Sequence, residues 1–294
     1  MASKMLLVDG NSLMHRAFHA LPVMTSESGE YTNALHGFMM MLLRVMEEEQ
    51  PDCIAVAFDR HAPTFRHLRY DEYKAGRAAT PDELRQQFIT IRELLAEMNI
   101  AMLEMDGYEA DDLLGTMSLK CEEQGIDAVI ITGDRDAFQL SGEHTTILYT
   151  KQGIKDTERV TPGFIMEKYG VEPVQLIDVK GLMGDHSDNI PGIAGIGEKT
   201  ALRLIVQYGS LESALDKAEA EQKGKLRERL MGGRESALFS KWLATIDRHA
   251  PLAAEPADCP VKRLSDGLKM LQRLQLKQVA AKLTSMEENS PEAA

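Results

Sequence analysis

Three acidic residues of this sequence each follow a short, continuous apolar run. Asp9 follows residues 5–8, Asp59 follows residues 53–58, and Asp134 comes after residues 128–132 and one glycine. Short runs that are apolar at every position are typical of parallel strands buried on both faces. The carboxyl ends of parallel strands lie along one edge of the sheet, where ligands bind. We therefore expect these three carboxylates to meet in one cleft.

Six further carboxylates are expected near the same edge of the sheet, at the start of a helix, two residues beyond Asp134, or in the turn 184–189. They are Glu109, Asp111, Asp112, Asp136, Asp185 and Asp188. Nine converging carboxylates could not all remain ionised unaided. Because Mg²⁺ and Mn²⁺ prefer oxygen ligands and keep several waters, the pattern predicts two such ions rather than zinc.

Each acidic cluster has a simpler interpretation by itself. An aspartate at a strand end is common turn chemistry, and acidic residues favour a helix N-terminus. An aspartyl-phosphate phosphatase would place its Asp-x-Asp after the first strand, where this chain has Asp9-Gly-Asn. The agreement of four clusters at matching positions favours the metal site.

The glycine-rich run 192–200 suggests a phosphate-binding turn. It does not match a P-loop, because Glu198 separates the last glycine from Lys199, and it lacks the third glycine of a dinucleotide fingerprint. A tight hairpin that leads into a helix would still present free backbone N–H groups to phosphate. The alternative is an ordinary glycine-rich connection between helices.

A second basic segment, residues 64–77, alternates cations with aromatic rings. Its members are Phe65, Arg66, Arg69, Tyr70, Tyr73, Lys74 and Arg77. This composition suits a grip on a nucleic-acid strand with stacked bases. The alternative is a solvated loop with extended side chains.

Length and composition limit the class of protein. With 294 residues and 44% hydrophobic content, the chain should form one large or two ordinary domains. It has no apolar run of about 20 residues and only three scattered cysteines, so we expect a soluble cytosolic protein without a membrane span, disulfides or structural zinc.

The net charge of −13, taken over the whole chain, argues against a nucleic-acid ligand. The charge is unevenly distributed, however: residues 93–143 carry 13 acidic and 2 basic side chains, whereas residues 60–85 and 217–234 are net basic.

The elements that must position these residues alternate between strands and helices. Helical patterns cover residues 33–49, the stretch from about 82, and 110–124, which with the apolar runs predicts an α/β fold with a parallel sheet. After about residue 175 the pattern becomes short and helical, and we expect a helical subdomain with helices at 174–183, 198–208, 210–217, 234–245 and 264–276. The acidic C-terminus is expected to be a flexible tail or linker.

Six segments occur in an order that resembles the 5′-nuclease (5′→3′ exonuclease) domains of bacterial DNA polymerase I, in the flap endonuclease superfamily. They are 7–12, 57–59, 107–113, 132–136, 183–192 and 195–201. The resemblance covers residues 4 to 283 and implies a PIN-like parallel sheet flanked by helices, with a helical arch or clamp over the cleft and a C-terminal helix–hairpin–helix subdomain. It implies a core at 1–175 with the arch at 60–85, a DNA-binding subdomain at 176–283, and a tail at 284–294.

The resemblance also implies roles for individual residues. Asp9, Asp59, Glu109, Asp111 and Asp112 match the ligands of a first metal ion, and Asp134, Asp136, Asp185 and Asp188 match those of a second. Lys74 and Arg77 match a basic pair that acts on the scissile phosphate. Arg16, His15, Tyr73, Gly195, Gly197, Lys199 and Thr200 correspond to DNA contacts, with potassium at the hairpin in some relatives. His15 departs from the tyrosine of many relatives.

We therefore expect a structure-specific 5′ nuclease that cleaves 5′ ends and 5′ flaps of DNA, and RNA primers, with two Mg²⁺ or Mn²⁺ ions. Its substrates would be DNA flaps, nicks and 5′ ends and RNA primer–DNA, with a DNA polymerase domain or protein as a possible partner. It would act as a monomer in the bacterial cytoplasm, at the nucleoid. The alternatives are a non-catalytic DNA-binding module, which would lack metal ligands, and a PIN-type ribonuclease, which would lack the hairpin.

Overall fold

The computed structural model describes residues 3–288, and these contain one six-stranded sheet with the strand order β3-β2-β1-β4-β5-β6. Its strands are β1 (Lys4–Asp9), β2 (Cys53–Ala57), β3 (Ala101–Leu103), β4 (Asp127–Thr132), β5 (Thr145–Gln152) and β6 (Asp156–Val160). All neighbouring strands pair in parallel except β5 and β6, which pair antiparallel. The expected parallel α/β sheet is confirmed.

The sheet changes direction of winding at β1. The chain moves outward from β1 through β2 to β3, and then returns to place β4 on the other side of β1. Ligands of open α/β sheets bind at such a switch point, beyond the carboxyl ends of the strands. Asp9 is the last residue of β1 and aligns with Ala57 at the end of β2.

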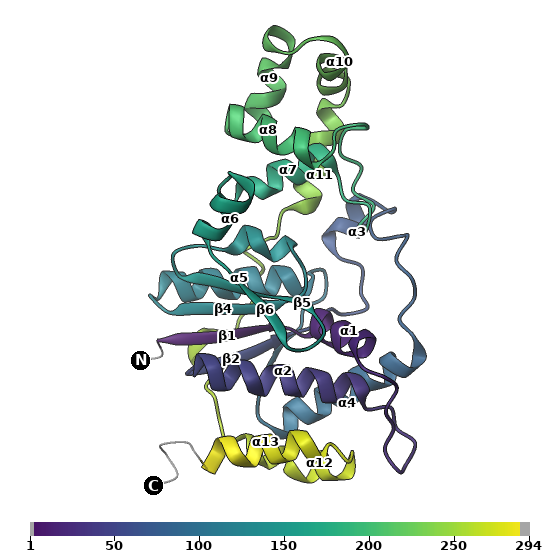
Figure 1. The fold of residues 1–294 in the computed structure, drawn as a ribbon, viewed down its shortest axis with the longest axis vertical. Helices are drawn as coiled ribbons and strands as arrows, with labels where there is room; N and C mark the ends of the chain where they lie inside the picture. The colour runs from purple at the N-terminus through teal and green to yellow at the C-terminus, as the bar shows by residue number, and fades with distance from the viewer. Residues whose placement is uncertain (1–2, 289–294) are drawn as a thin grey trace.

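Helices cover both faces of the sheet, as Figure 1 shows. Leu6, Val8 and Ile54 belong to a core on one face, and Met5 and Leu7 belong to a core on the other, because successive side chains of a strand point in opposite directions. The first core includes α1 (Gly10–Ala20), α2 (Asn33–Glu49) and α4 (Asp82–Glu97), and the second includes α5 (Ala110–Glu123). The continuous apolar runs reflect this burial on two sides.

A group of short helices stands beyond α5, at the top of Figure 1. It contains α6 (Pro162–Tyr169), α7 (Gln175–Met183), α8 (Glu198–Tyr208), α9 (Leu211–Glu221), α10 (Gly224–Gly232) and α11 (Arg234–Ala244). The turn between α7 and α8 requires glycine, since a Cβ on Gly192 would lie 2.2 Å from the backbone nitrogen of Gly184, and both have positive φ. The two glycines therefore fix the tight turn between these helices.

The boundary expected at residue 283 falls within a helix. After α11 the chain passes through η2 (Pro256–Asp258) and η3 (Leu264–Gly267) to α12 (Leu268–Arg273) and α13 (Lys277–Glu288), which lie beside α2 on the opposite side of the sheet from the helical group (Figure 1). Leu271 and Val279 are fully buried in the same core as α2. The expected tail also begins too early, since residues 284–288 are helical and the rest of it, 289–294, lies outside the described residues.

The segment expected to be a helical arch is mostly irregular. Only α3 (Phe65–Arg69) is helical between β2 and α4, and residues 70–81 form turns and extended chain. Lys74 itself has a φ of 57°, in the left-handed region. Lys74 and Arg77 therefore lie in an irregular segment and do not share a helix face.

Several elements carry too weak a pattern to be predicted. The strand β3 has only three residues, and β5 and the edge strand β6 mix polar with apolar residues. Within residues 3–288, no helix is both long enough and apolar enough to cross a membrane.

Candidate active site at the carboxyl edge of the sheet

The structure brings the first group of expected carboxylates to the end of the central strands. Asp9 caps α1, accepting from the backbone N–H of Ser12 at 2.9 Å and from the Thr132 hydroxyl at 2.6 Å. Asp59 follows β2 and accepts from the backbone N–H of Ala110, at the start of α5, at 2.7 Å. The switch point and the first turn of α5 thus hold these carboxylates together.

Burial, and after it the charge of neighbouring carboxylates, raises the pKa of acidic residues in this group. Burial raises the pKa of Asp9 to about 7, against hydrogen bonds from Thr132 and Ser12, and the nearby charges of Asp59 and Asp134 add to the effect. Burial, followed by the charges of Asp9 and Asp134, raises the pKa of Asp111 well above its ordinary range. Four carboxylates therefore lie close enough to interact electrostatically, with too little positive charge nearby to balance them. They are Asp9, Asp59, Asp111 and Asp134.

This donor set fits a divalent cation by its chemistry. Carboxylate oxygens with raised pKa values are ligands that a cation with two charges stabilises in the ionised form. Across the described part of the chain, no three Asp, Glu, His or Cys side chains form a ready-made cage around one point. The arrangement suits an ion such as Mg²⁺, which binds through one or two carboxylates and keeps several waters.

A second acidic group surrounds Lys180 of α7. The ammonium of Lys180 forms ion pairs with Asp136 and with Asp185, the latter at 2.6 Å. Burial and the charge of Asp134 raise the pKa of Asp136 to about 6, although Lys180 opposes the shift. Burial would raise the pKa of Asp185, but Lys180 and Ser187 outweigh it and lower this pKa to about 2. The sequence did not single out Lys180, because no spacing rule links it to Asp136.

Asp112 is engaged by the protein itself. It is fully buried, and its two oxygens accept from both terminal nitrogens of Arg66 at 2.8 Å and from the backbone N–H groups of Glu109 and Asp247. A carboxylate has about four acceptor positions, so these four hydrogen bonds use its capacity. In this arrangement Asp112 has no acceptor position left for a metal ion.

Glu109 is partly engaged in the same way. Its Oε2 accepts from the Tyr73 hydroxyl at 3.1 Å and from Arg66 at 3.3 Å, whereas its Oε1 lies 2.7 Å from Lys74 Nζ. Oε1 is thus the oxygen of Glu109 that lies on the side of Lys74, toward the cleft. Glu109 thus links the basic segment to the carboxylates.

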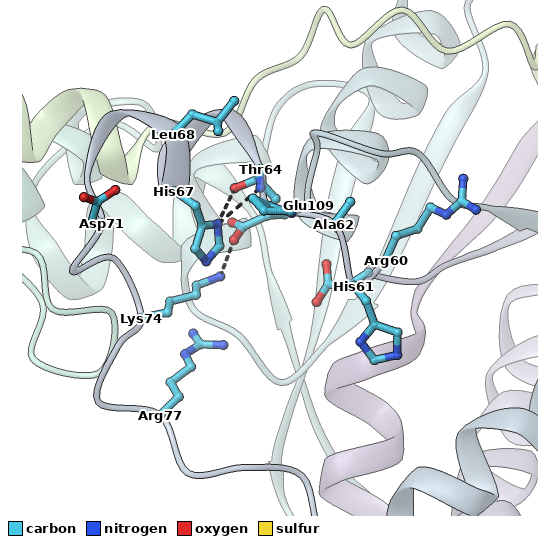
Figure 2. Close-up of a pocket in the computed structure, with 12 residues that line it drawn as sticks. Arg60, His61, Ala62, Thr64, His67, Leu68, Asp71, Lys74, Arg77 and Glu109 are labelled. Carbon is cyan, nitrogen blue, oxygen red and sulfur yellow. Dashed lines mark hydrogen bonds and ion pairs between the residues drawn. The ribbon is translucent and has the colours of Figure 1, made fainter.

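Lys74 and Arg77 face a pocket of about 630 Å³ that Asp59 and Glu109 also line. Figure 2 shows Lys74 reaching toward Glu109, with Arg77 beside it. Arg77 forms an ion pair with Asp188, and the Lys74 backbone N–H donates to the Asp188 carbonyl at 3.0 Å. The two cations therefore lie between the first acidic group and the turn 184–189.

The residues expected to contact DNA near the cleft are arranged less favourably. Tyr73 is only 4% exposed and cannot stack on a base, because Glu109 and the surrounding core enclose it. Arg16 donates to the backbone carbonyls of Thr150 and Lys151, which fixes it against β5. His15 is half-buried beside His19 and Phe88, and burial lowers its pKa. In this structure the Tyr73 ring is therefore not accessible to a base.

The glycines of the hairpin, Gly195 and Gly197, lie between α7 and α8. Gly197 precedes the first residue of α8, and Lys199 is exposed in the first turn of that helix, next to Thr200. Gly195 has a φ of 80°, and its carbonyl accepts from Arg229 of α10 at 2.9 Å. Arg229 is therefore a second cation at the hairpin, beside Lys199. The sequence indicated it only through the net positive charge of residues 217–234.

The fold and the site define the class of this protein. It has a resolvase-like α/β domain with carboxylates at one edge of its sheet, followed by a helical domain. The family model of the 5′-3′ exonuclease N-terminal resolvase-like domain matches residues 4–170, and the model of the 5′-3′ exonuclease C-terminal SAM fold matches residues 171–266. The chain belongs to the 5′-3′ exonuclease family.

Similar proteins agree with this assignment. The chain is 48% identical over 252 residues to DNA polymerase I of Bacillus caldotenax and 47% identical over 249 residues to DNA polymerase I of Bacillus subtilis. These alignments cover 86% and 85% of this chain but 29% and 28% of those polymerases, so the chain spans less than a third of their length.

Two solved structures share the fold at low sequence identity. The T5 5′-exonuclease with bound divalent zinc ions has a TM-score of 0.69 at 18% identity and covers 96% of this chain and 98% of its own. The catalytic core of Rad2 with a DNA substrate has a TM-score of 0.58 at 16% identity, with coverage of 96% and 91%. The helical domain and the sheet are therefore both part of the shared architecture.

Proposed function

We propose that this chain is a structure-specific, divalent-metal-dependent 5′ nuclease. It hydrolyses phosphodiester bonds at 5′ ends and 5′ flaps of DNA, and of RNA primers, during replication and repair in the bacterial cytoplasm. The observation that carries the proposal is the convergence of Asp9, Asp111 and Asp134 with the cations Lys74 and Arg77 around one edge of the sheet. The 48% identity to a DNA polymerase and the metal named for the T5 5′-exonuclease support it.

In this proposal two Mg²⁺ or Mn²⁺ ions are held by the two acidic groups. The first group is Asp9, Asp59, Asp111 and the cleft-facing oxygen of Glu109, and the second is Asp134, Asp136, Asp185 and Asp188. When bound, such ions supply an activated water and stabilise the leaving oxygen of a phosphodiester. Asp112 is left out of the set, because Arg66 and two backbone N–H groups already use its oxygens.

The second group must exchange partners when a cation binds. Lys180 now neutralises Asp136 and Asp185. If Asp136 and Asp185 held a divalent cation, the ammonium of Lys180 would lose these partners. Lys180 is thereby available to a phosphate of the substrate.

Lys74 and Arg77 act on the scissile phosphate in this proposal. Both are paired with carboxylates, Lys74 with Glu109 and Arg77 with Asp188, and both line the pocket beside Asp59. Cations placed before the reaction stabilise the charge that grows on the phosphate without reorganisation. Their contribution is therefore expected in the rate of cleavage more than in the affinity for DNA.

The α7–α8 hairpin grips the duplex in this proposal. No side chain caps the start of α8, and residues 197–199, which include Lys199, are exposed there, which suits a DNA phosphate. Potassium at the same hairpin belongs to the proposal through the family resemblance alone. If potassium binds at the hairpin, replacing K⁺ by Li⁺ at constant ionic strength should weaken duplex binding.

The test is cleavage of a 5′-labelled flap duplex, with matched single-stranded RNA as the competing substrate. Flap cleavage in Mg²⁺ and none in EDTA is expected. Binding of the flap without cleavage in either Mg²⁺ or Mn²⁺ would support a non-catalytic DNA-binding module instead. Preferential cleavage of the single-stranded RNA would favour a PIN-type ribonuclease.

A further inference from the structure

Arg66 is the most heavily bonded charged side chain around the candidate site. It is 2% exposed, and its guanidinium donates to both oxygens of Asp112 at 2.8 Å and to Glu109 at 3.3 Å. It also donates to the backbone carbonyls of Leu243 at 2.9 Å and Thr245 at 2.6 Å. One side chain of α3 thus joins the start of α5 to the end of α11.

Aromatic rings reinforce the contact between α3 and α11. The Phe65 ring lies 4.5 Å from the guanidinium carbon of Arg66 and 5.7 Å from the ring of Trp242. Trp242 stacks on Phe239 at 6.0 Å, and Phe239 meets Tyr70 edge-on at 5.5 Å. Both ends of α3 are therefore packed against α11.

The same contacts reach Lys74 through Glu109. Arg66 and the Tyr73 hydroxyl both donate to Glu109 Oε2, which fixes the orientation of the carboxylate. The other oxygen, Oε1, then points at Lys74 Nζ, 2.7 Å away. A shift of Arg66 would rotate Glu109 and move the ammonium of Lys74.

We propose that Arg66 is a positioning residue, which holds Lys74 in its reactive place through Glu109 and ties that place to α11 of the helical domain. Since the proposed function assigns the helical domain to duplex DNA, the inference rests on that function. The half of the molecule that grips the duplex would then determine where the cation of the cleavage site stands. Arg66 does not touch the substrate in this scheme.

The decisive experiment is a double-mutant cycle in the full chain with Arg66→Lys and Lys74→Ala. Lysine keeps the charge but cannot bond both oxygens of Asp112 in the planar geometry of arginine. Arg66→Lys should slow single-turnover cleavage of a 5′ flap by about 10²-fold, since a small misplacement of a catalytic group has effects of this size. Affinity for the flap should change only a few-fold.

The cycle distinguishes positioning from general stability. If Arg66 acts through Lys74, then adding Arg66→Lys to Lys74→Ala should slow cleavage little further, because residues that act as a unit are not additive. A fully multiplicative loss, or a normal rate in Arg66→Lys, overturns the proposal. Arg248→Met is the matched control, because Arg248 lies on the loop after α11 but pairs with Glu122 at the surface. It should cleave at the normal rate.

Trp242 gives a readout that is independent of catalysis. It is the single tryptophan of the chain and is 41% exposed on α11. Acrylamide should quench it more strongly in Arg66→Lys than in Arg248→Met. Unchanged quenching means that Arg66 does not hold α3 on α11. If the unaltered protein fails to cleave the flap, the proposed function fails, while this measurement still decides the docking of α3.

Where Arg66→Lys does not fold at the assay temperature, Phe65→Leu replaces it in the same cycle. This change removes the ring beneath the guanidinium but keeps an apolar side chain. Phe65→Leu should slow cleavage in the protein that retains Lys74 and should cause no further slowing in Lys74→Ala. Equal slowing in both backgrounds overturns the positioning role.

Discussion

The hydroxyl of Thr132, at the end of β4, donates a 2.6 Å hydrogen bond to Asp9 Oδ2, at the end of the adjacent β1. This bond joins the two strands on either side of the switch point and orients the central carboxylate of the candidate site. It favours the ionised form of Asp9, yet burial outweighs it and raises the pKa of Asp9 to about 7. The site is therefore built around a carboxylate that the protein alone does not hold in the charged state.

A pH dependence of stability follows from this carboxylate. The pKa of Asp9 is higher in the folded protein than its ordinary value of 3.8, so the folded state binds the proton more tightly. This contribution is fully present below pH 3.8 and is lost as the pH rises through about 7. In EDTA, the Tm should fall more steeply between pH 5 and 8 than in Asp9→Asn, which does not titrate. Parallel curves for the two proteins would contradict the assignment, and Mg²⁺ should reduce the difference between them.

Removal of one acidic charge near both groups should separate binding from chemistry. Asp134 raises the pKa of Asp9, Asp111 and Asp136, which places it between the two proposed metal sites. Asp134→Asn should remove most cleavage in Mg²⁺ while the affinity for duplex DNA, measured by fluorescence anisotropy in Ca²⁺, stays nearly unchanged. Full cleavage by this variant would disprove the two-metal assignment.

Asp111 and Asp112 are neighbours with opposite expected behaviour. Asp112→Asn leaves the buried Arg66 without its charged partner and should lower the free energy of unfolding by about 3–5 kcal/mol. Asp111→Asn removes a carboxylate whose pKa burial and its acidic neighbours raise, and should leave stability unchanged or increased. The Mg²⁺ concentration for half-maximal cleavage should rise for Asp111→Asn alone. A comparable rise for Asp112→Asn would return Asp112 to the metal ligands.

Lys74→Ala should show a defect of rate rather than of affinity. The ammonium lies beside Glu109 in the pocket and is expected to meet charge that develops on the phosphate. Loss of one such donor typically lowers the rate by about 10²–10³-fold. Single-turnover cleavage at saturating enzyme measures this, with flap affinity expected to change a few-fold. A normal rate with much weaker binding would make Lys74 an ordinary backbone contact.

Lys199→Ala should instead weaken binding. An exposed lysine that neutralises one phosphate contributes about one unit to the slope of log affinity against log salt. The variant should therefore show weaker duplex binding at moderate salt and a slope smaller by about one unit. An unchanged slope would remove the hairpin from the DNA interface. Lys282→Ala is the control, because Lys282 lies on α13, at the opposite end of the molecule from α8 (Figure 1).

The amino-acid sequence by itself determined the class of fold and the location of the site. Runs such as 5–8 and 128–132 are apolar at every position because the sheet is covered on both faces, and such runs are visible without any tertiary information. The topology of a parallel sheet then places Asp9, Asp59 and Asp134 at one edge. Local signals were also enough for the helix α8 and its glycine hairpin.

Tertiary structure alone decided which of the similar residues are available for chemistry. Asp111 and Asp112 are adjacent in sequence, but α5 turns Asp112 toward Arg66 and toward the loop after α11. In that loop, the backbone N–H of Asp247 donates to Asp112 from 135 residues away in the sequence. Tyr73 and Lys74 likewise differ in that the first is enclosed and the second reaches the pocket. No local pattern encodes these long-range partners, because burial and hydrogen-bond saturation depend on segments that meet only when the chain has folded.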